Sequence, residues 1–270
     1  MTLTPTPRQR ELLDSVRLRR SASVDELALH LGVTPQTVRR DAQALAEAGL
    51  LARFHGGVGL PESTTENIGY AQRQALHAEG KRRIAQRVAH LVPDGAALFI
   101  NIGTTTEEIA RALLKHRDLR VVTNNLNVAA ILSESAGCEV IVAGGTVRAR
   151  DRGIVGEAAI DFLRQFRVDL GLIGISSIEE DGTLRDFDLR EVKVARAIIE
   201  QSRAVWLCAD HSKFTRQAMV ELGPVTLVDA VVTDAEPAAP MRALLQKVGV
   251  RCEVADQPVG TAATLRSASA

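Results

Sequence analysis

The sequence is poor in cysteine, with only Cys138, Cys208 and Cys252 among its 270 residues. Their number is odd and their spacing is wide, so neither a disulfide framework nor a CxxC metal-binding pair can be built from them. Unpaired cysteine behaves as a small apolar side chain and is commonly buried. We therefore expect all three thiols to be buried.

Long apolar segments are also absent. No apolar run approaches the ~20 residues that span a bilayer, and residues 1–10 lack the charged head and apolar stretch of a secretory signal. The hydrophobic content of 46% is enough for a substantial core at this length. We expect a soluble cytoplasmic protein of one large or two unequal domains, with no membrane partner.

Net charge is lacking as well, because 33 basic residues cancel 33 acidic ones. This balance excludes a general polyanion binder of the histone type. Residues 1–60 contain eight arginines and six acidic residues, a local excess of two positive charges. Such a weak field would hold DNA loosely at physiological salt, so a DNA-binding function would need an oligomer to multiply the phosphate contacts.

Three common catalytic motifs are missing. The sequence contains no GK[ST] of a P-loop, and its six histidines show no HExxH pattern. The segment 174–178, Gly-Ile-Ser-Ser-Ile, lacks the final glycine of a GxSxG nucleophile turn. We therefore predict no catalytic residues, no bound cofactor and no metal site.

The first 60 residues predict three helices followed by a hairpin. Ser23 and Glu26 form a capping box at the start of the second helix, and Thr34 caps a third helix that has Pro35 at its first position. The segment 51–58 predicts two short strands around a Gly-Gly turn. This order is typical of a winged helix-turn-helix, which we predict for residues 1–60.

The third helix of this domain carries the side chains suited to reading DNA. Val38, Ala42 and Leu45 share one face and can pack inward, which leaves arginine and glutamine outside. Arginine can bond guanine and glutamine can bond adenine in the major groove, although a merely solvated face would have the same composition. We expect Asp41 to pair with an adjacent arginine. The predicted DNA-contacting residues are Thr34, Gln36, Thr37, Arg39, Arg40, Gln43, Arg53 and His55.

Short apolar runs alternate with helical segments in the remainder of the chain. The runs predict buried strands at 96–102, 119–123, 138–143, 168–175, 204–209 and 229–233, mostly separated by helices near 106–116, 126–136, 157–166 and 189–202. This alternation predicts a larger α/β domain with a doubly wound parallel sheet over residues 80–256. Residues 61–79 are interpreted as a linker and residues 257–270 as a disordered tail.

Polar and basic side chains follow several of the predicted strands. Ligands bind at the carboxyl ends of strands in open α/β sheets, so these segments should converge. A glycine and three threonines at a helix start suit a phosphate, although an ordinary strand-to-helix turn has the same pattern. Carboxylates could accept hydrogen bonds from hydroxyl groups, and the arginines could equally lie on the surface. The predicted effector-binding residues are Gly103, Thr104, Thr105, Thr106, Asn124, Asn125, Gly144, Gly145, Arg148, Arg150, Ser176, Asp186, Glu191 and Lys213.

These motifs resemble the DeoR family of bacterial repressors, along nearly the whole chain to about Val254. The segments that carry the resemblance are 33–41 (VTPQTVRRD), 53–57 (RFHGG), 122–128 (VTNNLNV), 143–145 (AGG), 154–158 (IVGEA) and 210–214 (DHSKF). The resemblance implies a repressor that binds operator DNA as a homo-oligomer, either a dimer or a tetramer. It also implies release of that DNA when a phosphorylated polyol, sn-glycerol 3-phosphate, binds.

The larger domain also resembles ribose-5-phosphate isomerase in its layout. Gly103-Thr104-Thr105 lies where that enzyme has its phosphate loop, and the segments 190–193 and 212–213 are similar to its active-site segments. The isomerase carries Asp-Gly-Ala-Asp-Glu where this chain has residues 174–178, so Glu191 would lack catalytic companions. The resemblance implies binding without turnover, with an isomerase-like enzyme carrying a DNA-binding head as the alternative.

Overall fold

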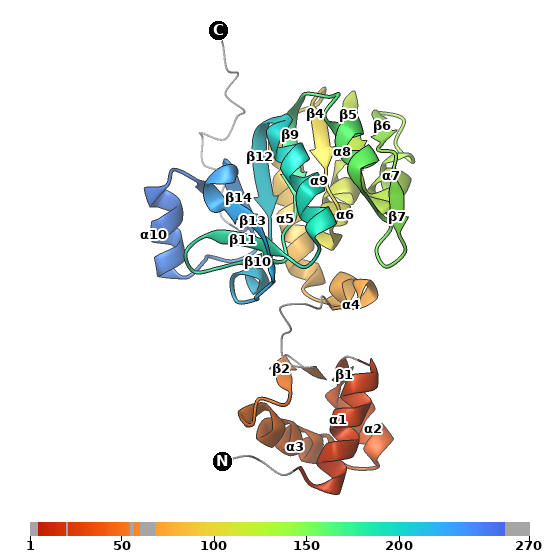
Figure 1. Cartoon of the computed structure of the whole chain (residues 1–270), viewed down its shortest axis with the longest axis vertical. Helices are drawn as coiled ribbons and strands as arrows, with labels where there is room; N and C mark the ends of the chain where they lie inside the picture. Colours follow the sequence, from red (N-terminus) through yellow and green to blue (C-terminus); the bar gives the residue numbers. More distant parts are fainter. Residues whose placement is uncertain (1–4, 20, 55–56, 60–67, 257–270) are drawn as a thin grey trace. The chain divides into compact units, whose positions relative to one another are not determined.

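The computed structural model describes residues 5–19, 21–54, 57–59 and 68–256. The chain divides into two compact units, residues 1–68 and residues 69–270, and each has its own hydrophobic core (Figure 1). His55 and the predicted tail at 257–270 lie outside the described residues. Within the described part of the chain, none of the helices has the length and apolarity that crossing a bilayer requires.

The first unit is a three-helix domain with a small antiparallel sheet. Its elements are α1 (Pro7–Arg19), β1 (Ser21–Ser23), α2 (Val24–Leu31), α3 (Pro35–Glu47), β2 (Ala52–Phe54) and β3 (Gly57–Gly59). The strands pair in the order β1-β3-β2, so the expected hairpin has a third strand that the sequence analysis did not predict. The winged helix-turn-helix prediction is confirmed.

The helices of this unit begin and end where the capping residues place them. The Ser23 side chain accepts from the backbone N–H of Glu26, and the Glu26 side chain accepts from the backbone N–H of Ser23, which completes the predicted capping box. Gly32 ends α2 in the left-handed region with φ 62°, a conformation that costs glycine little. Thr34 then caps α3 through the backbone N–H of Thr37.

The second unit is built on a seven-stranded parallel sheet in the order β15-β14-β12-β9-β4-β5-β6. These strands are β4 (Ala97–Ile100), β5 (Leu119–Thr123), β6 (Cys138–Val142), β9 (Val168–Ile173), β12 (Ser202–Cys208), β14 (Ala230–Thr233) and β15 (Arg251–Val254). Six of the seven were predicted, and the doubly wound fold class is confirmed. The edge strand β15 was missed.

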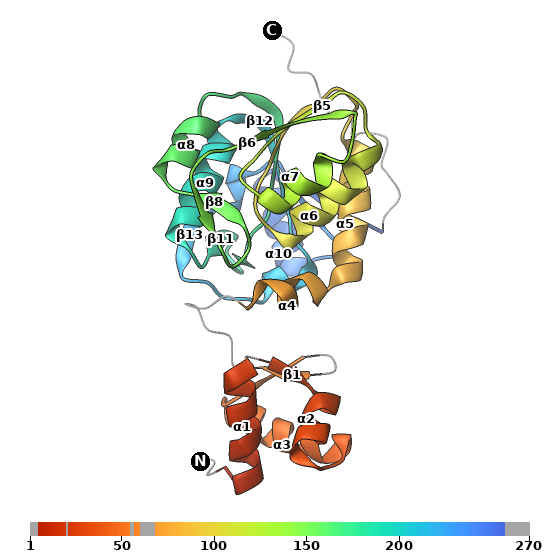
Figure 2. The same cartoon turned by 90° about the vertical axis from the view of Figure 1, so that its right-hand side faces the viewer.

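Helices cover both faces of this sheet (Figure 2). They are α5 (Ala78–Leu91), α6 (Thr104–Ala112), α7 (Leu126–Leu132), α8 (Glu157–Leu163), α9 (Leu189–Glu200) and α10 (Ala239–Lys247). A further helix, α4 (Tyr70–Ala75), lies beyond one end of the sheet (Figures 1 and 2), and 3-10 turns occur at Leu113–Lys115, His211–Phe214 and Val225–Leu227. Alternate residues of β4 supply the two layers of core. Leu98 and Ile100 belong to the core layer that includes residues of α5, α6 and α7, whereas Phe99 belongs to the layer that includes residues of α8, α9 and α10.

Two small antiparallel sheets flank the main one. The first joins β10 (Ser177–Ile178), β11 (Thr183–Asp186) and β13 (Val220–Pro224), and the second is the hairpin of β7 (Thr146–Arg148) and β8 (Gly153–Val155). Cys208 is buried in the sheet, but Cys138 and Cys252 are only half-buried. The expectation of three buried thiols was therefore wrong for these two, because both belong to edge strands of the main sheet.

Residues 69–79, which the sequence analysis placed in the linker, belong to the second unit. Tyr70 donates a hydrogen bond of 2.6 Å to the Glu107 carboxylate on α6. The buried Lys81 ammonium donates to the backbone carbonyls of Arg73 and, at 2.6 Å, of Leu76. These polar contacts fix α4, whose six residues contain no fully buried side chain and therefore left no apolar pattern to detect.

A core substitution tests the independence of the first unit. Leu45 of α3 is fully buried, so we expect Leu45→Ala to destabilise this unit by roughly 2–5 kcal/mol. Hydrogen exchange of the full chain should lose protection in α1–α3 and keep it in the main sheet. Leu29→Ala is the matched control, because the Leu29 side chain is 87% exposed and its loss should change stability by less than about 0.5 kcal/mol. Equal exchange in both variants would contradict the assignment.

Candidate functional site

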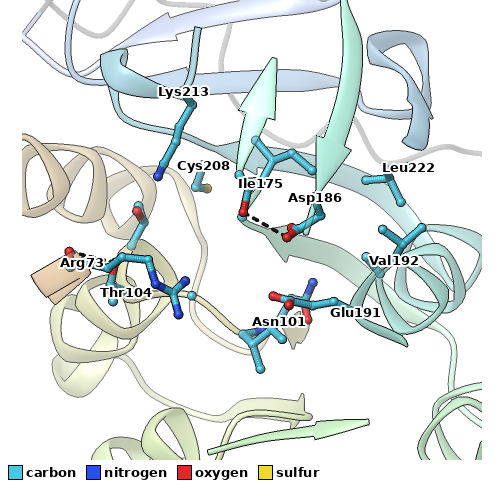
Figure 3. Close-up of a pocket in the computed structure, with 16 residues that line it drawn as sticks. Arg73, Asn101, Thr104, Ile175, Asp186, Glu191, Val192, Cys208, Lys213 and Leu222 are labelled. Atoms are coloured by element: carbon cyan, nitrogen blue, oxygen red, sulfur yellow. Dashed lines mark hydrogen bonds between the residues drawn. The ribbon is translucent and has the colours of Figure 1, made fainter. Parts of the chain in front are cut away.

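The candidate site lies where the strand order of the main sheet reverses. The chain leaves β4 for β5 and β6 on one side, whereas β9 and the later strands continue on the other. Loops after β4 and β9 therefore diverge and leave a pocket at the carboxyl ends of these strands. The pocket is partly open to solvent. It consists of Arg73, Asn101, Ile102, Gly103, Thr104, Thr105, Gly174, Ile175, Ser176, Asp186, Glu191, Val192, Ala195, Cys208, Lys213 and Leu222 (Figure 3).

The loop after β4 forms one wall of the pocket. Gly103 occupies the N-cap position of α6 with φ 147°, a conformation that side chains disfavour. Thr106 donates to the backbone carbonyls of Asn101 and Gly103, which holds the loop closed against the helix start. Because glycine offers no capping side chain, the first N–H groups of α6 face the pocket beside Thr104 and Thr105.

Two cations lie on the same side of the pocket as this loop (Figure 3). Lys213 comes from the 3-10 turn after β12, and burial lowers the pKa of its ammonium to about 8. Arg73 comes from α4, and one of its terminal nitrogens lies 3.4 Å from the Asp151 carboxylate. The Arg73 Nε atom is buried and has no hydrogen-bond partner among the described residues. Both groups are placed to neutralise an anion.

Two buried carboxylates form the opposite wall (Figure 3). Ser176 donates a hydrogen bond of 2.9 Å to Asp186. Burial and the neighbouring Asp186 raise the pKa of Glu191 to about 7, and burial also raises the pKa of Asp186. At neutral pH this wall therefore holds less than its full negative charge, and a protonated carboxyl group can donate as well as accept hydrogen bonds.

Arg148 supports the pocket from behind. Its guanidinium makes ion pairs of 2.8 Å with Glu191, 2.9 Å with Asp188 and 2.7 Å with Asp151. Burial opposes its charge, but these carboxylates outweigh that effect and raise the pKa of Arg148, while the pKa of Asp188 is lowered. Arg148 thus positions Glu191 and does not itself line the pocket.

The pocket brings together seven of the predicted effector residues, namely Gly103, Thr104, Thr105, Ser176, Asp186, Glu191 and Lys213. The other seven predicted residues are not among those that line the pocket. They are Thr106, Asn124, Asn125, Gly144, Gly145, Arg148 and Arg150. Most of these hold the surrounding loops. Asn124 donates to the Ile154 carbonyl, Asn125 caps α7, and Arg150 lies 3.4 Å from the Glu191 carboxylate. The two glycines are exposed at the start of β7.

The sequence analysis missed Arg73, Asn101 and Cys208 as pocket residues. Arg73 was hidden because its helix was interpreted as linker. Asn101 directly follows the apolar run of β4 at 3% exposure, and a polar residue at that point is a signal that could have identified it. Its side-chain oxygen accepts from the backbone N–H of Ile102, which fixes the turn into the loop.

The first unit presents the predicted DNA-reading face on α3. Val38, Ala42 and Leu45 are buried, as expected from their spacing. The side chains of Gln36, Arg39, Arg40, Gln43 and Arg53 are exposed, and Thr34 and Thr37 lie at the helix start. Gln43 is hydrogen-bonded to Glu47. His55 lies outside the described residues.

Asp41 does not pair with an adjacent arginine as expected. It is 6% exposed on the inner side of α3 and accepts a 2.6 Å hydrogen bond from Arg8 of α1. The neighbouring Arg39 and Arg40 point to the other side of the helix, because residues one or two positions apart do not face each other. This ion pair therefore joins two helices and leaves both arginines of α3 exposed.

Comparisons with known proteins agree with these two units. A model described as the DeoR-like helix-turn-helix domain matches residues 8–64, and one described as the DeoR C terminal sensor domain matches residues 76–235. A solved structure of ribose 5 phosphate isomerase A from Neisseria gonorrhoeae covers 50% of this chain and 53% of its own chain. Its identity is 14% and its TM-score 0.35, too low to carry an argument about activity.

Relatives along the full length are much more similar. The glycerol-3-phosphate regulon repressor of Escherichia coli (strain K12) is 48% identical over 92% of this chain and 98% of its own length. The protein of the same name from Haemophilus influenzae is 49% identical over 85% of this chain and 89% of its own. The family resemblance seen in the motifs is confirmed, and this chain belongs to the DeoR family of transcriptional repressors.

Proposed function

We propose that this chain represses transcription by binding operator DNA through α3 and the β2–β3 hairpin. The exposed arginines and glutamines of α3 support this assignment, as do the names of the relatives. Residues 1–60 carry an excess of only two positive charges, so stable binding calls for two or more heads on one operator. The repressor would therefore act as a homodimer or homotetramer, in the cytoplasm where its operator lies.

The effector in this proposal is a phosphorylated polyol, most directly sn-glycerol 3-phosphate, which the names of the relatives suggest. One observation carries the assignment: the uncapped start of α6 at Gly103 shares a pocket with Lys213 and Arg73. The phosphate would be bound by the helix start and the two cations. The polyol hydroxyls would meet Asp186 and Glu191 on the opposite wall.

We propose binding without turnover. The segment that follows β9 is Gly174-Ile175-Ser176, so it supplies a hydroxyl to the pocket and no carboxylate. Glu191 is held by Arg148 at 2.8 Å and shares its wall with Asp186. A base tied into an ion pair suits the recognition of hydroxyl groups better than proton abstraction. No separate observation favours the enzymatic alternative.

Arg73 offers a route from the pocket to the DNA-binding unit. It belongs to α4, which begins one residue after the start of the second unit. A phosphate that attracts the Arg73 guanidinium would favour one position of α4 over another. A tenfold loss of operator affinity requires only ~1.4 kcal/mol of such preference, which lies within the usual range of allosteric coupling.

Effector response should depend on Lys213. In a gel-shift titration, sn-glycerol 3-phosphate is expected to release the wild-type chain from an operator obtained by in vitro selection. Lys213→Ala should bind that operator normally but need roughly 10- to 100-fold more effector, since the loss of a hydrogen bond to a charged group costs ~1.5–3 kcal/mol. Lys247→Ala, at an exposed lysine of α10 outside the pocket, is the control and should respond as wild type does. A normal response in Lys213→Ala would refute the role.

Effector affinity should fall as the pH rises from 7 to 9. The pKa of Lys213 is about 8 without effector, and a bound phosphate would favour the charged ammonium. Binding therefore takes up a proton above pH 8, and affinity should drop by up to ~10-fold per pH unit there. Ionisation of Glu191, whose pKa is about 7, adds repulsion in the same direction. Phosphate itself titrates near pH 6, below this range, so its ionisation does not cause the drop. Arginine stays charged in this range, so the effector affinity of Lys213→Arg, measured by calorimetric titration, should not fall between pH 8 and 9. An unchanged fall would exclude Lys213 as its source.

Arg39 should matter for DNA and not for the effector. If its exposed guanidinium contacts a base, Arg39→Ala is expected to weaken operator binding by ~1–3 kcal/mol. Calorimetry of the variant with effector alone should match wild type. Arg82→Ala, at an exposed arginine of α5, should bind operator normally. Undiminished operator binding by Arg39→Ala would show that this side chain is only solvated.

A further inference from the structure

Three ligand-type side chains meet outside the effector pocket, where α5 begins and β12 ends. They are His77, Asp210 and His211, and one potential ligand atom from each lies within 4.8 Å of the others. His77 is the residue just before α5, whereas Asp210 and His211 begin the 3-10 turn two residues after the end of β12. The fold therefore brings together two imidazoles and a carboxylate from distant parts of the chain, the nitrogen and oxygen donors that zinc accepts in proteins.

Asp210 carries an unsatisfied oxygen at this point. Its side chain is 1% exposed. One carboxylate oxygen, Oδ1, accepts from the backbone N–H and the hydroxyl of Ser212, but the buried Oδ2 has no hydrogen-bond partner in the part of the chain that the structure describes. A buried acceptor without a partner costs free energy that a bound ion would recover.

His211 is oriented as metal-binding histidines commonly are. Its Nδ1 atom lies 2.8 Å from Oδ2 of Asp234, and its backbone N–H donates to Oδ1 of the same residue at 2.7 Å. Asp234 is buried, and it approaches α5 closely because Gly80 has no side chain to block it. A carboxylate on Nδ1 fixes the tautomer and directs Nε2 outward as the free donor.

His77 completes the set from the other side. It has φ 53°, in the left-handed region that non-glycine residues rarely adopt, and it lies at the turn between α4 and α5. Its ring centroid is 4.6 Å from that of His211, with the planes nearly perpendicular. Both imidazoles are exposed on one side, so an ion has an entry path from solvent.

We propose that His77, Asp210 and His211 form a binding site for a divalent transition metal such as Zn²⁺, with water in the fourth position. Zinc ligands at about 2.0–2.1 Å from the ion lie roughly 3.3 Å apart in a tetrahedron, so the exposed imidazoles must close by rotation. Lys213 and Lys81 are the opposing charges near Asp210. The Lys81 ammonium donates to the carbonyls of Arg73 and Leu76. The carboxylates of Asp210 and Asp234 supply the negative charge.

Such an ion would join the α4–α5 turn to the end of β12. It would do so beside the effector pocket, because Arg73 precedes this turn and Lys213 follows His211 by two residues. The site goes beyond the proposed function and does not depend on it. Metal would stabilise the second unit by mass action, and the effector would not be required.

The test uses the full-length chain, free of any affinity tag and stripped with a chelator. Equilibrium dialysis against Zn²⁺ is expected to give one ion per chain, and Co²⁺ should give the visible absorption of a four-coordinate site. His211→Ala and His77→Asn should each weaken binding by at least about tenfold, and asparagine is chosen because it tolerates the left-handed backbone. Asp234→Asn should weaken binding about 10- to 100-fold through the orientation of His211.

His90→Ala is the matched control. His90 lies near the end of α5, the helix that follows His77, and it is exposed and outside the cluster. It should bind Zn²⁺ as wild type does. Melting temperatures measured without metal establish whether each variant is folded. Because His211 and His77 belong to different segments, one variant still tests the site if the other fails to fold. Absence of zinc binding by the wild type at 100-fold molar excess would overturn the proposal, and so would histidine variants that both bind zinc as tightly as the wild type does.

Discussion

The parallel pairing of β4 with β9 is the constraint on which the rest of the second unit depends. These two strands lie side by side in the sheet, yet the chain runs away from them in opposite directions. The loops that follow β4 and β9 therefore diverge and leave the carboxyl ends of these strands uncovered, so other elements must close this end of the sheet. Arg73 from α4, Glu191 from α9 and Lys213 from the 3-10 turn after β12 supply that closure.

The charged groups around the pocket do not form isolated ion pairs, because one guanidinium pairs with several carboxylates. Arg148 holds three carboxylates, and its absence would leave buried negative charges unpaired, which is far more costly than the loss of a surface ion pair. Lys213 and Arg73 face the uncapped helix start, and each has a carboxylate near it: Asp210 interacts with Lys213, and Asp151 lies 3.4 Å from Arg73. The pocket thus has one half lined by cations and another lined by the carboxylates of Asp186 and Glu191.

Local patterns made the elements and the caps predictable. The spacing of Val38, Ala42 and Leu45 defined the buried face of α3, and the apolar runs located six of the seven strands. The site was only half predictable, because proximity across strand ends is set by three-dimensional packing. Asn124 and Asn125 looked like ligand groups, yet they bond the surrounding backbone and side chains. Helix α4 escaped detection because polar contacts and not apolar burial hold it in place.

Lys81 limits how far α4 can move relative to α5. The residue is 3% exposed, and its ammonium donates to two carbonyls near the end of that helix. If α4 turned by itself, a buried charge would lose its acceptors, at a cost larger than the 1–3 kcal/mol of typical coupling between sites. A movement of α4 therefore has to include the first turn of α5, because Lys81 in that turn is bonded to both Arg73 and Leu76.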